Sequence, residues 1–86
     1  MSRYFVYVLL CYDNTLYTGW TTNILKRLSK HNSGRGAKYT RSRTPVCIVY
    51  SEEMKSKSAA MKKEYRVKQL SRKEKARLCH IEEIII

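Results

Sequence analysis

The pattern of apolar and polar positions along the chain predicts three β-strands and three α-helices. Residues 4–11 are apolar or aromatic on both alternating faces, as in a central strand that is covered on both sides. Turn residues at 13–15 lead into a second strand at 16–20. Another apolar run, at 46–53, begins directly after Pro45 and predicts the third strand.

A first helix is predicted after the second strand, where capping residues and apolar spacing agree. Thr22 or Asn23 can cap its start, and Gly34 can end it in a left-handed conformation. His31 extends the apolar stripe by one turn, and Arg27 lies four residues earlier on the same edge. The stripe itself consists of Ile24, Leu25 and Leu28.

Two further helices are predicted in the last third of the chain. Ser56 or Ser58 can cap a helix that runs to about Leu70. The sequence at 71–74 is a capping box that opens another helix, directed towards the end of the chain. The tail at 81–86 suits either a last helical turn or a short strand.

The element order β-β-α-β-α-α predicts one α+β domain over residues 1–86, in which helices pack on a small three-stranded mixed sheet. A two-residue loop between the first two strands would place Tyr7 and Tyr17 on opposite faces. If both tyrosines share a site, the loop must be odd in length, such as 13–15, or contain a bulge.

The net charge indicates a polyanionic partner. The chain has 18 Lys and Arg against 7 Asp and Glu, for a net charge of +11. Such an excess of positive charge favours nucleic acid as the first candidate partner and an anionic membrane surface as the second. The alternative is that the basic residues form only a solvated surface. The basic loop at 33–45 is long for so small a domain, and the stretch 55–77 holds ten more basic residues. We expect salt-dependent nucleic-acid contacts from Lys26, Arg35, Lys38, Arg41, Arg43 and Lys68.

Cysteine usage and the N-terminal sequence bear on the compartment. Cys11, Cys47 and Cys79 form no C-x-x-C pair, and we interpret them as small buried residues in a reducing compartment. The N-terminal apolar run is too short to span a bilayer and lacks a signal-peptide cleavage site. We therefore expect a cytoplasmic protein that does not bind a membrane, and the sequence indicates no protein partner.

Glu64 is the residue that apolar patterning does not explain. On a helical wheel it lies among Ala60, Met61 and Val67, and an unpaired carboxylate on a core face is costly. One interpretation is an ion pair with Lys68 at i+4. The other is a carboxylate that reaches into a cleft and holds a hard cation such as Mg²⁺.

Four other residues have ordinary structural interpretations when each is taken alone. Tyr7 and Tyr17 suit strands, Arg27 suits a solvated helix edge, and His31 suits a helix end. Together with Glu64, however, these residue types suit phosphodiester hydrolysis. That reaction requires a cation or arginine on the phosphate, a base for water and a proton for the leaving oxygen.

The sequence resembles the GIY-YIG superfamily, and in particular its small stand-alone members, over nearly the whole chain. Residues 5–7 (FVY) stand at the first motif and residues 17–19 (YTG) at the second. The segment RLSKHN matches the arginine and histidine of the following helix, and EYRVKQLSRKEK contains the glutamate. Phe5 stands in place of glycine and Thr18 in place of isoleucine. The asparagine near the family's C-terminal end has no clear counterpart.

The resemblance implies a metal-dependent endonuclease that hydrolyses DNA with low sequence specificity. One tyrosine would activate water and the other would support it, with Arg27 on the phosphate and His31 assisting proton transfer. Glu64 would bind one divalent metal, Mg²⁺ or Mn²⁺. A free tyrosine has a pKa of about 10, so the base needs a nearby positive charge.

Two other functions remain open from the sequence. One is a basic nucleic-acid-binding module with weak or lost catalysis, because correct residue types do not prove correct geometry. The other is a small basic protein of a ribonucleoprotein, which would share the charge but would not need Glu64 on an apolar face.

Overall fold

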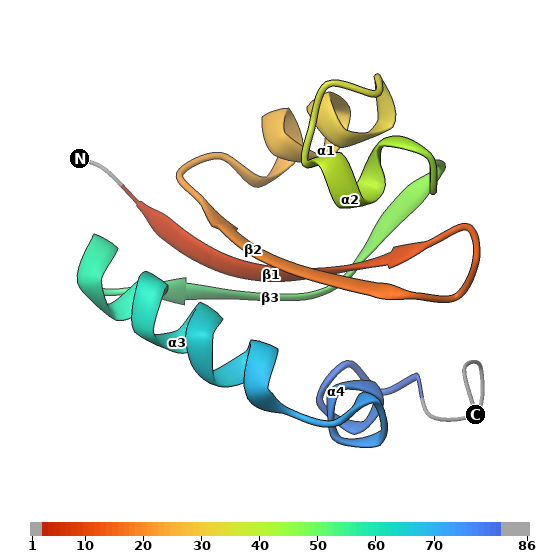
Figure 1. The fold of residues 1–86 in the computed structure, drawn as a ribbon. Coiled ribbons are helices and arrows are strands. Elements are labelled where there is room, and N and C mark those ends of the chain that lie inside the picture. Colours follow the sequence, from red (N-terminus) through yellow and green to blue (C-terminus); the bar gives the residue numbers. More distant parts are fainter. Residues whose placement is uncertain (1–2, 82–86) are drawn as a thin grey trace.

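The protein is described by a computed structural model over residues 3–81, in which helices cover both faces of a sheet (Figure 1). Within this range the sheet has the order β2-β1-β3, with β1 (Tyr4–Cys11) between β2 (Leu16–Thr21) and β3 (Val46–Met54). The run that is apolar on both alternating faces is therefore the central strand, as expected. The predicted α+β architecture is confirmed.

The sheet is antiparallel throughout, whereas the sequence interpretation was a mixed sheet. β1 pairs with both β2 and β3 in antiparallel register. The chain from β2 to β3 returns to the end of the sheet at which β2 began, so β2 and β3 run in the same direction. β1 lies between β2 and β3, so these two parallel strands form no hydrogen bonds with each other.

The β1–β2 connection has the odd length that a shared tyrosine site requires. The Cys11 amide donates to the Thr15 carbonyl at 2.9 Å, which leaves residues 12–14 as a three-residue loop. Asn14 takes the left-handed conformation, with φ of 66°, that closes such loops. The loop thus lies one residue earlier than 13–15. Its register pairs Leu9 with Tyr17, so Tyr7 and Tyr17 face the same side.

Two helices cover this side of the sheet. α1 (Ile24–Asn32) begins at Asn23, whose side chain accepts a hydrogen bond from the Lys26 amide at 3.0 Å. Leu25 was predicted in the apolar stripe but is 75% exposed, because it falls on the outer edge of the helix. The predicted loop after α1 contains a further single turn, α2 (Lys38–Arg41).

The other side of the sheet is covered by α3 (Lys57–Gln69) and α4 (Arg72–Leu78). Ser56 caps α3, and the predicted capping box at 71–74 is present at the start of α4. α4 ends earlier than expected, and His80 follows it with φ of 58°. The prediction for the tail mostly concerns residues 82–86, which lie outside the described residues.

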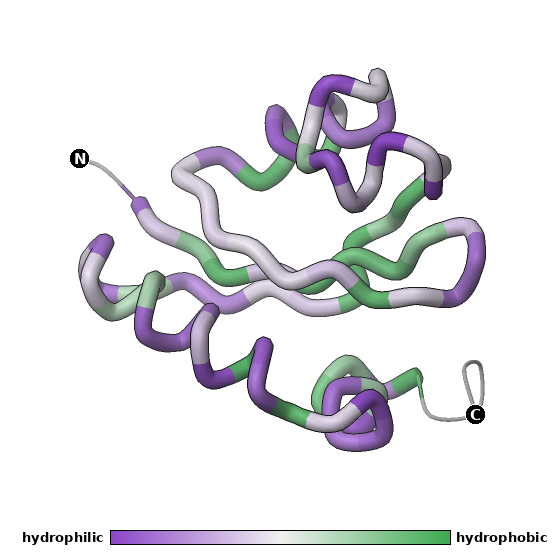
Figure 2. Tube along the Cα trace, in the orientation of Figure 1, coloured by the Kyte–Doolittle hydropathy of each residue, from purple (hydrophilic) through white to green (hydrophobic). Residues whose placement is uncertain are grey.

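Each face of the sheet has its own apolar core, and the helices are largely hydrophilic outside it (Figure 2). Towards α3 and α4 the core contains Val8, Val67, Ala76, Cys79 and Ile81. Towards α1 it contains Tyr7, Leu9, Cys11 and Val46. Tyr7 is thus a core residue as well as a candidate catalytic one. No helix among residues 3–81 is long and apolar enough to cross a membrane.

Candidate active site at the edge of the sheet

The two tyrosine motifs meet where Gly19 lies opposite Tyr7 in the β1–β2 ladder. The Tyr7 ring lies over Gly19 so closely that a Cβ at residue 19 would be 2.6 Å from the Tyr7 hydroxyl oxygen. Only glycine leaves room for this ring position. The centroids of the Tyr7 and Tyr17 rings are 6.5 Å apart. Glycine in the second motif therefore sets the position of the tyrosine in the first.

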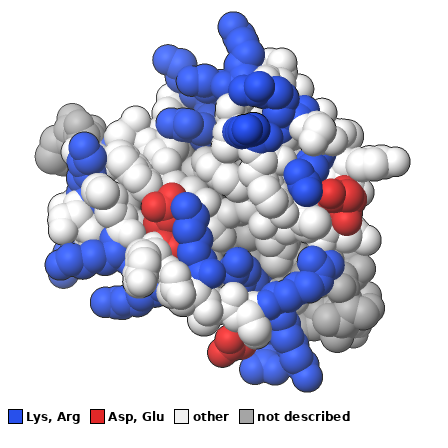
Figure 3. Space-filling model, viewed as in Figure 1, with Lys and Arg blue, Asp and Glu red and all other residues white. Residues whose placement is uncertain are grey.

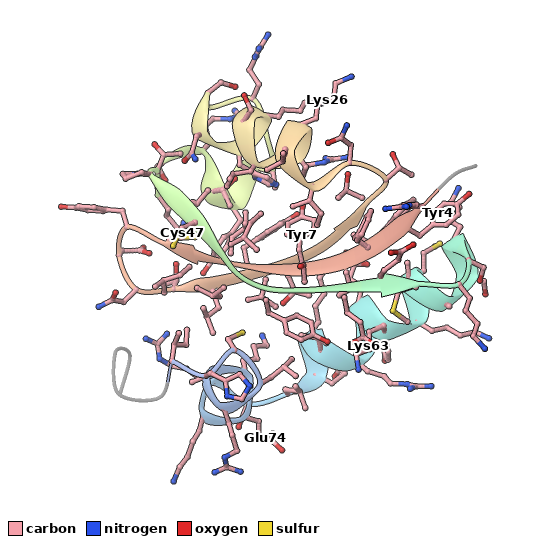
Figure 4. The ribbon with its side chains drawn as sticks, turned by 180° about the vertical axis from the view of Figure 1, so that it is seen from behind. Tyr4, Tyr7, Lys26, Cys47, Lys63 and Glu74 are labelled. Carbon is pink, nitrogen blue, oxygen red and sulfur yellow. The ribbon has the colours of Figure 1, made fainter. Side chains whose placement is uncertain are left out.

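A chain of side-chain contacts runs from Tyr7 into the protein. The Tyr7 hydroxyl oxygen is 3.1 Å from His31 Nε2, and His31 Nδ1 is 2.7 Å from Thr40 Oγ1. His31 is 1% exposed and Thr40 is fully buried. Figure 4 shows Tyr7 on the side of the sheet that faces α1, the helix that carries His31. The buried His31 is therefore connected to the surface of the site by its contact with the Tyr7 hydroxyl.

Four elements, β1, β2, α1 and α3, contribute to a surface pocket in front of Tyr7. Arg27 comes from α1, and Glu64 comes from α3 on the opposite side of the sheet. Glu64 reaches the pocket past β2, because β2 is an edge strand. Trp20, which follows the second motif directly, was not predicted as a site residue. The pocket is lined by Tyr7, Tyr17, Gly19, Trp20, Thr21, Thr22, Arg27 and Glu64.

The sequence matches one known protein family over most of its length. Residues 3–77 match the GIY-YIG catalytic domain. The chain belongs to the GIY-YIG family. It is 51% identical to a UPF0213 protein of Staphylococcus haemolyticus over 91% of this chain and 95% of that protein. It is 57% identical to a UPF0213 protein of Natronomonas pharaonis over 90% of this chain and 91% of that protein.

The fold is shared with a solved relative. The solution NMR structure of a UPF0213 protein from Bacillus halodurans superimposes with a TM-score of 0.59 at 47% sequence identity. The alignment covers 92% of this chain and 84% of that chain. The GIY-YIG pattern departs from its name at Phe5, Val6 and Thr18. Thr18 faces away from the pocket, since it pairs with Val8 of the other core.

Burial and neighbouring charges set the protonation of this GIY-YIG site. Burial raises the pKa of the Tyr7 hydroxyl, and Tyr17 and Glu64 raise it further, while Arg27 opposes the shift. Burial lowers the pKa of His31, and positive neighbours, Arg27 first, lower it further. At neutral pH the ground state therefore has a protonated Tyr7 beside a neutral His31. A neutral imidazole can accept the phenol proton, whereas an imidazolium cannot.

Glu64 is paired with Lys68, as one interpretation from the sequence expected, and it also lines the pocket, as the other interpretation requires. Its carboxylate lies 3.6 Å from the Lys68 ammonium, as an i,i+4 ion pair, and its side chain is 22% exposed at the pocket wall. Within residues 3–81 no group of three or more His, Cys, Asp and Glu side chains could enclose a metal. Mg²⁺ nevertheless binds commonly through one or two carboxylates together with waters and substrate phosphates. A lone carboxylate beside an open polar pocket fits that pattern.

Most of the predicted nucleic-acid contacts lie on exposed surfaces around the pocket. Lys26 points outward from α1 (Figure 4) and lines a second pocket, which shares Thr21, Thr22 and Arg27 with the first. Arg35 lies in a further pocket that also contains Lys26. Lys and Arg gather over the α1–α2 layer in Figure 3, with few acidic groups on that face. Lys38 and Arg41 of α2, and Lys68 of α3, are also exposed.

Arg43 differs from these residues because its guanidinium is engaged within the protein. Arg43 Nε lies 3.0 Å from the Asp13 carboxylate, and an Nη donates to the Tyr39 carbonyl at 3.0 Å. Its planar head lies 4.2 Å from the centroid of the Tyr39 ring, which stacks on Tyr17. These contacts tie the loop before β3 to the β1–β2 turn, which is a structural role that the sequence did not indicate.

Proposed function

We propose that this GIY-YIG domain is a divalent-metal-dependent endonuclease that hydrolyses the phosphodiester bonds of DNA with little sequence preference. The observation that carries the proposal is the convergence of Tyr7, Tyr17, Arg27 and Glu64 on one pocket, with His31 directly behind Tyr7. These residues come from four elements on both sides of the sheet. A core needs no such convergence of polar groups, whereas phosphodiester hydrolysis does.

Each side chain has a role that its position supports. Arg27 contacts the scissile phosphate and stabilises the charge that develops on it. Tyr7 takes a proton from the attacking water while its own proton passes to His31 Nε2, 3.1 Å away. This coupled transfer suits a tyrosine whose pKa is raised, because a free phenolate need not form first. Tyr17 supports the position of the water.

Glu64 would hold the metal, with water and phosphate oxygens as the other ligands. A bound Mg²⁺ or Mn²⁺ supplies electrostatic stabilisation of the phosphate and of the leaving oxygen. Lys68 would keep the carboxylate paired until the metal binds, since the two side chains are in contact at 3.6 Å.

DNA would bind mainly through its phosphates. The pocket beside the candidate site is lined by Lys26, Arg27 and Lys30, so a strand that enters the site can continue along α1. Lys38 and Arg41 extend the positive surface over α2. Such contacts carry no base information and weaken as salt rises. A substrate chosen by shape rather than by sequence is consistent with them.

A second candidate is a DNA-binding module with weak or lost catalysis. It is favoured by the ion pair between Lys68 and Glu64, which occupies the carboxylate that a metal needs. The basic surface would serve either function equally well. An assay of DNA cleavage, rather than one of DNA binding, therefore distinguishes the two candidate functions.

The test is nicking of supercoiled plasmid with Mg²⁺ or Mn²⁺, with and without a chelator, by the parent and by Glu64→Gln. We expect Glu64→Gln to bind DNA and melt like the parent but to nick about 100-fold more slowly, since metal stabilisation is worth several kcal/mol. Glu53→Gln is the matched control, because it removes the same charge from a β3 side chain that is 55% exposed.

Two outcomes would contradict the proposal. If Glu64→Gln lowers the melting temperature and retains the parent's nicking, Glu64 serves only its pair with Lys68. If the parent nicks under no divalent metal while it still binds DNA, the second candidate is correct.

A further inference from the structure

The proton positions around His31 follow from three consecutive contacts. These contacts join the Tyr7 hydroxyl to Nε2 at 3.1 Å, Nδ1 to Thr40 Oγ1 at 2.7 Å, and Thr40 Oγ1 to the Ala37 carbonyl at 3.0 Å. The carbonyl oxygen can only accept. Tyr7, neutral His31 and Thr40 supply one proton each. Three protons are thus available for three contacts.

Only one arrangement gives every contact a proton. Thr40 donates to the Ala37 carbonyl, His31 Nδ1–H donates to Thr40, and Tyr7 donates to the bare Nε2. In the other tautomer, Thr40 would have to donate to Nδ1. Its oxygen would then face the Ala37 oxygen at 3.0 Å without a proton between them, which is repulsive.

We propose that Thr40 is a positioning residue that holds His31 in the Nδ1–H tautomer and so presents Nε2 as the acceptor for the Tyr7 proton. The catalytic consequence rests on the function proposed above, whereas the tautomer does not. In a neutral histidine, the hydrogen bond at one ring nitrogen decides whether the other nitrogen carries the proton.

Backbone hydrogen bonds and Gly36 hold Thr40 and His31 in position for their contact. The Thr40 amide bonds to the Ala37 carbonyl at 3.1 Å, and the Thr40 carbonyl accepts from the Arg43 amide at 3.0 Å, which fixes the single turn of α2. Gly36 lies against the His31 ring, where a Cβ would be 2.7 Å from Cγ. The segment 33–45, which the sequence suggested only as a phosphate-binding loop, therefore also orients the histidine.

The tautomer can be observed directly by ¹⁵N NMR of the histidine side chains in the whole protein, without metal or DNA. The chain has two histidines, and His80 is exposed, so a His31→Asn variant assigns the signals. We expect an imine-type shift at His31 Nε2 and an amine-type shift at Nδ1 in the parent and in Thr40→Ser. Thr40→Val, which keeps the shape but removes the hydroxyl, should shift the population towards Nε2–H.

Nicking assays then test the catalytic consequence. Thr40→Val should lower the nicking rate about 100-fold with unchanged DNA affinity, and Thr40→Ser should restore it. A parent with protonated Nε2, or a Thr40→Val protein that keeps pure Nδ1–H, overturns the proposal. If Thr40→Val does not fold, the parent spectrum and Thr40→Ser still decide the tautomer. A parent that never nicks overturns the proposed function but leaves the NMR result to test Thr40.

Discussion

Replacing Gly19 with alanine tests whether the position of the Tyr7 ring limits activity. The new Cβ would lie 2.6 Å from the Tyr7 hydroxyl oxygen and 2.8 Å from Cζ. Ordinary contacts begin near 3.4 Å, so the ring must move by roughly 0.8 Å. Tyr7 is 3% exposed, and its hydroxyl already contacts His31. The shift therefore changes the hydrogen bond that the proposed proton transfer uses.

This displacement of the Tyr7 ring should lower both the stability of the protein and its rate of nicking. Overpacking a core of this kind costs about 1–3 kcal/mol of stability. Misplacing a reacting group by about 1 Å costs on the order of 100-fold in rate. We expect Gly19→Ala to melt several degrees lower, since 1 kcal/mol corresponds to about 4–8 °C in a domain of this size. We expect plasmid nicking, measured well below the melting temperature, to fall about 100-fold.

Gly34→Ala is the matched control. It makes the same chemical change after α1, where a Cβ would meet nothing within 4 Å but the backbone has φ of 82°. Left-handed backbone costs a residue with a side chain about 1–2 kcal/mol, so the control loses stability without touching Tyr7. If Gly19→Ala nicks as fast as Gly34→Ala and its His31 ¹⁵N shifts match the parent's, the reasoning about Tyr7 is wrong.

Two further predictions concern stability and DNA binding. Thr18 Oγ1 is buried without a hydrogen-bond partner among the described residues, so Thr18→Val should stabilise the protein by about 1–2 kcal/mol and raise its melting temperature. A lower melting temperature would show that the hydroxyl is satisfied. Lys38→Ala with Arg41→Ala should weaken binding to all DNA sequences and reduce the salt dependence of affinity by up to about two phosphate contacts. A salt dependence equal to the parent's would exclude α2 from the DNA-binding surface.

Much of the fold could be predicted from the sequence because the determining interactions are local. The caps at Asn23, Ser56 and Ser71 are hydrogen bonds to amides three residues later, so residue type and spacing suffice to identify them. The central strand could be recognised because burial on both faces requires apolar residues throughout. Local pattern also identified Glu64 as anomalous, since a carboxylate in an apolar helical stripe needs a reason.

The tertiary structure decided what depends on contacts between distant segments. Whether Arg43 binds phosphate or pairs with Asp13 depends on where the β1–β2 turn lies, thirty residues earlier in the chain. The antiparallel sheet follows from the direction in which the chain returns after α1.

In the candidate site, too, the sequence indicated some residues and only the tertiary structure identified others. Residue types and the family resemblance indicated Tyr7, His31 and Glu64, because those groups suit phosphodiester hydrolysis. Thr40 carries no signal of its own, since one threonine in a polar loop resembles any other. Its hydroxyl matters because α2 brings it within 2.7 Å of a histidine nine residues away. Hydrogen bonding is short-ranged and directional, so only the folded chain determines which hydroxyl orients the imidazole.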